Sequence, residues 1–191
     1  MAPGLLSLWR SETMIKLPLL LSLSASLALS FSVLKTKAVT LEQLHNDATL
    51  TPQTFARHFS KFRFVFQADV RKPQDFLAAE AGDCDDYSTL AAAELSARGY
   101  QTRLVSVRMK NIVHVVCYVT EGNGYLDYNL RAKGSGIVPC GPSLTEMADA
   151  VAKSFNSPWH SVSEFTYSDG VKRLVSTTPA KPRYIANATH P

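Results

Sequence analysis

Hydrophobic and polar positions change their spacing near residue 100, from a helical period to an alternating one. Residues 84–98 place apolar side chains three and four positions apart, and Gly99 follows as a stop signal. This pattern predicts a helix of about 14 residues that begins at Cys84. The segments 100–109 and 111–120 are rich in β-branched residues and predict two strands. "EGNG" predicts a turn, and "YLDYNL" at 125–130 is the expected return strand of a hairpin.

Weaker signals on both sides of this core predict further helices and strands. Thr51 and Pro52 supply an N-cap and a first helical position, after a polar connection that begins at residue 41. Ser143 and Glu146 form a capping box. Expected helices lie in 52–62, 73–82 and 143–155, and expected short strands in 63–70, 161–167 and 171–176. Helices that precede an antiparallel sheet predict an α+β fold.

The N-terminal segment has the pattern of an export signal. A basic start at Lys16 precedes an apolar, serine-rich run from Leu17 to Leu34, and "ALS" within it fits the small-residue cleavage rule. We expect a cleaved signal and an exported protein, periplasmic or extracellular. An uncleaved membrane anchor is the alternative, since about 18 apolar residues can just span a bilayer. The expected organisation is a signal peptide or anchor over 1–38, an enzyme domain over 39–177 and a flexible tail over 178–191.

Length and charge narrow the classes of function. A chain of 191 residues with 46% hydrophobic content is long enough for one cored domain with tails. The formal charge of +4 is spread along the chain, and its densest basic cluster, 57–63, also carries aromatic residues. Without a stripe of Lys and Arg to contact phosphates, we expect no nucleic-acid partner.

The three cysteines allow two interpretations. In an exported chain an odd number leaves one thiol free, so Cys117 and Cys140 could form a disulfide that leaves Cys84 unpaired. Alternatively, Cys117 and Cys140 are small buried apolar residues. Both interpretations leave Cys84 as the thiol that is available for chemistry.

Cys84, His114 and Asp127 are candidates for a nucleophilic site. A thiol reacts as thiolate, and a helix N-terminus supplies partial positive charge where Cys84 lies. The nucleophile also needs a base, and the base needs an acceptor on its other ring nitrogen. His114 is the one histidine inside a strongly predicted strand, and Asp127 is on the return strand of the same hairpin.

The length of the turn decides whether His114 and Asp127 share a face. A tight turn at Glu121 and Gly122 sets Val116 opposite Asp127, which makes His114 a diagonal neighbour on the same face at about 7 Å. A four-residue loop puts the two further apart, and a three-residue loop puts them on opposite faces. The triad therefore requires the tighter turn or a bulge.

These residues and their surroundings resemble a known superfamily. "GDCDDYSTLAAAELSARGYQTRLVSV", then "HVVCYV" and "YLDYN", all within 73–131, resemble the transglutaminase-like superfamily, and "GDCDDY" most resembles its bacterial cysteine proteinases. The resemblance implies a papain-like core in which Cys84 is the nucleophile, His114 the general base and acid, and Asp127 the residue that orients His114.

Three aspartates beside Cys84 should oppose thiolate formation, since like charges disfavour ionisation. In one interpretation Asp83 caps the helix, while Asp85 and Asp86 complement its dipole and point away from the sulfur. In a second, protonated His114 pairs with the thiolate at closer range. The third is a bound calcium ion with Asp83 and Asp85 as ligands, which the resemblance to the bacterial proteinases suggests. We expect no required cofactor, with calcium as the alternative.

The expected reaction is attack of the Cys84 thiolate on an amide carbonyl of a peptide or protein substrate. A thioester forms, and His114 delivers a proton to the leaving amine. The backbone N–H of Cys84 can stabilise the oxyanion, and Gln67 or Gln74 can supply a second donor. We favour hydrolysis by a cysteine peptidase. The alternatives are acyl transfer to an amine, as in a transglutaminase, and a binding module that keeps the fold without turnover.

Overall fold

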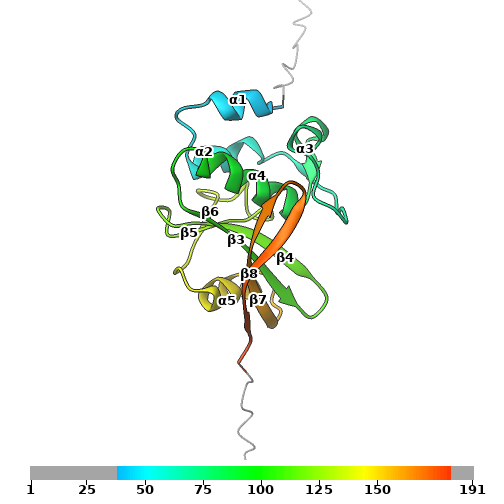
Figure 1. Cartoon of the computed structure of the whole chain (residues 1–191), viewed down its shortest axis with the longest axis vertical. Helices are drawn as coiled ribbons and strands as arrows, with labels where there is room; N and C mark the ends of the chain where they lie inside the picture. The colour runs from blue at the N-terminus through cyan, green and yellow to red at the C-terminus, as the bar shows by residue number, and fades with distance from the viewer. Residues whose placement is uncertain (1–37, 182–191) are drawn as a thin grey trace, which may run out of the picture. The chain divides into compact units, whose positions relative to one another are not determined.

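The computed structural model describes residues 38–181 as helices that pack on an antiparallel sheet (Figure 1). The helices are α1 (Leu41–Asn46), α2 (Pro52–His58), α3 (Pro73–Ala79), α4 (Cys84–Ser96) and α5 (Leu144–Ser154). The strands are β1 (Arg63–Phe64), β2 (Ala81–Gly82), β3 (Thr102–Met109), β4 (Val113–Val119), β5 (Gly124–Leu126), β6 (Ile137–Pro139), β7 (Trp159–Ser168) and β8 (Val171–Pro179). The predicted α+β class is confirmed.

The main sheet has six strands in the order β6-β5-β4-β3-β7-β8, and all of its neighbours pair antiparallel. A separate parallel pair joins β1, which precedes α3 in the sequence, to β2, which lies just before α4. Side chains alternate along the strands, so the sheet buries two apolar clusters. The cluster on one face includes α4 residues with Val115 and Cys117, and the other includes α5 residues with Val116 and Tyr118. Figure 1 shows α4 and α5 on opposite sides of the sheet.

Helix α4 begins where the sequence predicts, and capping explains why. The side chain of Asp83 accepts the backbone N–H of Asp85 at 3.1 Å, while Asp86 accepts the backbone N–H of Asp83 at 3.3 Å. These bonds satisfy donors that a helix N-terminus leaves free. The opposite end of α4 is Ser96, and the turn that follows contains Gly99, whose φ of +86° suits glycine better than other residues. Cys84 is therefore held at the first position of a 13-residue helix.

The β4–β5 hairpin has the register that the tight turn predicts. Cys117 pairs with Leu126 and Tyr118 pairs with Tyr125, so Glu121 and Gly122 form a two-residue turn. Asn123 closes this turn, because its N–H donates to the Thr120 carbonyl at 3.0 Å. The return strand is shorter than expected, since β5 ends at Leu126 and a turn begins beyond Asp127.

Several helices and strands have bounds that differ from those expected from the sequence. Helix α1 falls within a segment that we expected to be a polar connection, and β1 reduces the strand expected over 63–70 to two residues. Strand β8 continues to Pro179 and therefore includes the first two residues of the tail expected over 178–191. The expected export segment and the end of the tail fall outside the described residues. Within 38–181, no helix combines the length and apolar character needed to cross a membrane.

Strand β8 forms one edge of the sheet and is exposed along almost its whole length. Its register with β7 shifts between Glu164 and Phe165, which pair with Ser176 and Leu174. Val175 is therefore an extra residue in β8, as in a β-bulge. The side chain of Leu174 is 65% exposed.

Candidate active site

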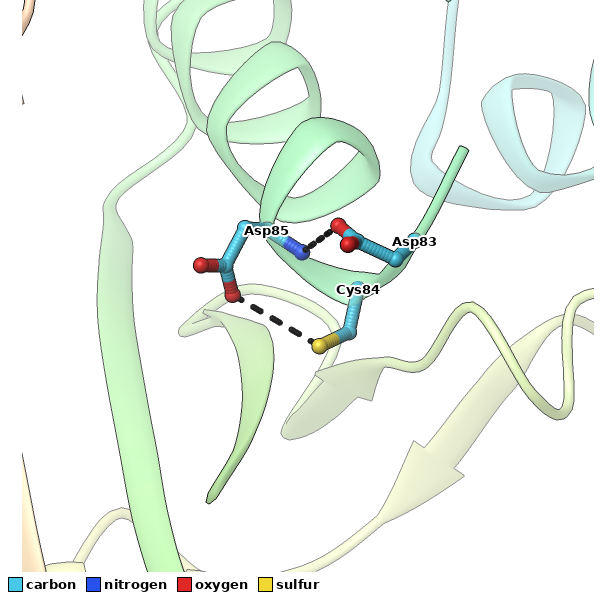
Figure 2. A group of neighbouring side chains, drawn as sticks. All are labelled: Asp83, Cys84 and Asp85. Atoms are coloured by element: carbon cyan, nitrogen blue, oxygen red, sulfur yellow. Dashed lines mark hydrogen bonds between the residues drawn. The ribbon is translucent and has the colours of Figure 1, made fainter. Parts of the chain in front are cut away.

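Cys84 lies at the start of α4 with an aspartate on each side (Figure 2). The Asp83 carboxylate accepts two backbone N–H groups, from Asp85 at 3.1 Å and from Gln67 at 2.9 Å. The cap of α4 is therefore also the anchor of the segment that precedes α3. Asp83 has the capping role that the sequence predicts.

The capping interpretation expected Asp85 to point away from the sulfur, but in the structure Asp85 points toward it. The Cys84 thiol donates to Asp85 Oδ1 at 3.5 Å, a contact drawn in Figure 2. Burial, followed by the negative charge of Asp85, raises the pKa of the Cys84 thiol to about 12, and a backbone hydrogen bond at Val115 opposes this rise. Burial and the neighbouring Asp83 also raise the pKa of Asp85. In this arrangement the helix N-terminus alone does not ionise the thiol.

Asp86 fixes the residues around the nucleophile, a role that the sequence analysis did not assign. Its buried carboxylate accepts the backbone N–H of Arg71 at 2.7 Å and that of Asp83 at 3.3 Å. A Cβ on Gly82 would lie 2.5 Å from Asp86 Oδ2, so glycine is required for this close approach. The acid three residues after the Asp83 cap is a capping-box signal that could have identified Asp86.

His114 and Asp127 form a buried pair. His114 Nε2 lies 2.9 Å from Asp127 Oδ1, and the two side chains are 2% and 0% exposed. Asp127 Oδ1 also accepts the backbone N–H of Asn129 at 2.8 Å. The His114 ring packs against Phe155 with centroids 4.8 Å apart. Among residues 38–181, His114 Nδ1 has no hydrogen-bond partner, so this nitrogen remains free to exchange a proton.

The structure brings His114 to Asp127 but forms no hydrogen bond between Cys84 and His114 in the part of the chain that it describes. Val115, the residue after His114, connects the start of α4 to the strand that carries His114. The Ser88 hydroxyl donates to the Val115 carbonyl at 3.2 Å, and the Cys84 thiol contacts the backbone of the same residue. The first turn of α4 is therefore packed against β4 beside His114.

A comparison with protein families identifies the fold. The family model DUF553, described as a transglutaminase-like domain, matches residues 25–130, which is more than half of the chain. This chain belongs to the transglutaminase-like domain family. The match includes Cys84, His114 and Asp127 and confirms the resemblance at the level of the superfamily. The narrower likeness to bacterial cysteine proteinases stays a prediction, and no match is found among the curated proteins.

Calcium fits poorly at the nucleophile of this transglutaminase-like domain. Asp83, Cys84 and Asp85 bring one ligand atom each within 4.8 Å of one another. Calcium takes six to eight oxygen ligands, whereas this group supplies two carboxylates and a soft sulfur. Both oxygens of Asp83 already accept backbone N–H groups. The two carboxylates and the thiol therefore suit a helix cap better than a calcium site.

The two candidates for the second oxyanion donor lie in different places. Gln67 is next to the α4 cap, because its backbone N–H donates to Asp83, whereas Gln74 lies in the first turn of α3.

Cys117 and Cys140 belong to clusters on opposite faces of the sheet, and all three cysteines are free. The structure therefore favours the interpretation of Cys117 and Cys140 as unpaired residues.

Proposed function

We propose that this transglutaminase-like domain hydrolyses amide bonds in peptides or proteins with Cys84 as nucleophile, His114 as base and acid, and Asp127 as the orienting residue. The observation that carries the proposal is the buried 2.9 Å contact between His114 and Asp127. Because Nε2 is engaged, His114 Nδ1 is the nitrogen that takes and returns the proton.

The proposed reaction has two halves. His114 takes the thiol proton, the sulfur attacks the carbonyl carbon, and the backbone N–H of Cys84 stabilises the oxyanion. Expulsion of the amine, protonated by His114, leaves a thioester on Cys84. Water then attacks the thioester, and its proton passes to His114 as the acid product leaves. Contact with His114 replaces the resting contact between the thiol and Asp85.

The test measures thiol-dependent turnover of a defined peptide mixture by mass spectrometry, with a fluorescent primary amine present as a competing acceptor. Wild type should produce peptides cleaved by the addition of water, or peptides in which water has replaced ammonia at a side-chain amide, and Cys84→Ala and His114→Ala should not. Incorporation of the amine in place of water would support acyl transfer. A wild type without turnover, whose Cys84 is alkylated as fast in His114→Ala as in the unmodified chain, would overturn the proposal and favour a binding module.

We also propose that the protein is exported, on the basis of the basic and apolar pattern before residue 38. Expression of the full chain with fractionation and intact-mass measurement tests this. Removal of the N-terminal segment from the exported form supports cleavage, retention of the full mass in the membrane fraction supports an anchor, and a full-length chain in the cytoplasm overturns the proposal.

A further inference from the structure

A cavity of about 700 Å³ lies beside the nucleophile. The segment 68–73 lines one part of it, and Tyr167, Gly170 and Lys172 of the β7–β8 hairpin line another. The lining also includes Asp85, whose Oδ1 accepts the Cys84 thiol. The volume is in the range of ligand-binding pockets. The space beside Asp85, the residue that follows the nucleophile, is therefore bounded by the hairpin and by the segment that Asp83 and Asp86 anchor.

A second cavity, of about 330 Å³, lies along α4. Tyr167 lines both cavities, and the other lining residues of the second come from α4, β3 and β7. Its α4 lining extends from Thr89 to Ser96, in the direction away from Cys84. Two neighbouring cavities that share Tyr167 in their linings suit an extended chain better than a compact small molecule.

The charged residues that line the larger cavity favour the binding of an acidic side chain. Lys72 and Lys172 line it from different segments, and neither has an ion-pair partner within the described range. The third cation, Arg71, donates to the Ala81 carbonyl at 3.0 Å and lies 3.8 Å from Asp86.

The carboxylates in the lining do not cancel this preference. The lining contains two carboxylates, Asp69 and Asp85; burial raises the pKa of Asp85, and the positive charge of Lys172 opposes this rise. The Lys172 ammonium lies 3.9 Å from the centre of the ring of Phe165, a residue that lines the second cavity. The three cations of the larger cavity, Arg71, Lys72 and Lys172, outnumber its two carboxylates.

We propose that this cavity binds an extended polypeptide substrate beside the amide bond under attack, and that Lys172 selects an acidic side chain there. The inference rests on the proposed function, because it assigns the substrate class of the same site. Lys172 acts through charge and does not take part in the chemical steps.

Peptidyl chloromethyl ketones test the selection without a known substrate. With these reagents the Cys84 sulfur forms a bond to the methylene carbon, chloride leaves and the thiol proton passes to His114. The measured quantity is the rate of Cys84 labelling by two reagents that differ only in glutamate or glutamine next to the reactive group. Wild type should react about fivefold faster with the glutamyl reagent, the ratio that corresponds to about 1 kcal/mol for an exposed ion pair.

Charge reversal at Lys172 is the decisive comparison. Lys172→Glu should remove or invert the ratio, whereas Lys133→Glu, an exposed site outside the cavity lining, should keep it. Iodoacetamide has no peptidyl part, so its rate of Cys84 labelling corrects each variant for a change in thiol reactivity, which Lys172 can cause through its effect on Asp85. An unchanged ratio in Lys172→Glu would overturn the selection and leave the proposed function standing. Labelling of Cys84 that is indifferent to His114→Ala would instead refute the proposed function and this inference together.

Discussion

Replacement of Asp85 by asparagine should make Cys84 more reactive. The thiol lies 3.5 Å from Asp85 Oδ1, so a thiolate formed there would be repelled by the carboxylate. At this separation the repulsion between two unit charges is about 5 kcal/mol for an effective dielectric constant of about 20, and about 1 kcal/mol in water. Because Asp85 is half-buried, solvent screens the pair and the lower end is appropriate.

A loss of about 1 kcal/mol of repulsion lowers the pKa of the Cys84 thiol by about 0.7 unit. The thiolate fraction then rises about fivefold at any pH below the thiol pKa. A thiolate of lower pKa is also a weaker nucleophile, which reduces the gain in alkylation rate to about twofold. The direction follows from the sign of the removed charge, since loss of an anion favours a second anion.

The assay measures iodoacetamide modification at Cys84 by peptide mass spectrometry, which separates it from Cys117 and Cys140. Rates are measured across the pH range below the thiol pKa, in the presence of a chelator. Asp75→Asn, which removes an exposed carboxylate in the first turn of α3, should have the wild-type rate. An Asp85→Asn rate equal to or below that of wild type would refute the conclusion that Asp85 holds the thiol in its neutral form.

Three further substitutions test the scaffold, each by urea denaturation. Asp127→Ala should lower the free energy of unfolding by about 2–4 kcal/mol, because it leaves buried donors, including His114, without an acceptor. Gly82→Ala should lower it by about 1–3 kcal/mol, because the new Cβ would lie 2.5 Å from Asp86 Oδ2. Ser143→Ala should cost about 1 kcal/mol, because the side chain caps α5.

Each of these three substitutions has a control variant that should lose less stability. Asp127→Asn keeps an oxygen acceptor and should lose less stability than Asp127→Ala. Gly122→Ala places a Cβ no closer than 3.3 Å to its nearest neighbour and should be milder than Gly82→Ala. Ser143→Thr keeps the hydroxyl and should retain most of the cap. Equal losses within any of these pairs would contradict the physical cause that we assign.

The elements that carry the candidate site were predictable because their determinants are local. The start of α4 depends on the Asp83 cap, and the helical spacing continues to Gly99. The register of the β4–β5 hairpin follows from its two-residue turn, which puts His114 and Asp127 on one face. Sequence spacing was therefore sufficient to bring this pair together.

What the sequence did not determine depends on long-range packing. The thiol pKa is raised mainly by burial against the sheet, which has no signal in the residues next to Cys84. The orientation of Asp85 toward the sulfur likewise depends on a side-chain rotamer. Cys117 and Cys140 were compatible with a disulfide until their strands placed them on opposite faces of the sheet.

The bulge at Val175 affects how molecules of this protein meet in concentrated solution. An open sheet edge can recruit a strand from a neighbouring chain and begin fibre growth, and β8 exposes the apolar Leu174 at such an edge. Three features of β8 oppose this recruitment: the bulge interrupts the hydrogen-bond ladder, Lys172 and Arg173 repel a second copy, and Pro179 lacks an N–H. The same lysine that we assign to substrate selection thus also helps to keep the molecules apart, and neutralising it would remove part of the barrier to aggregation.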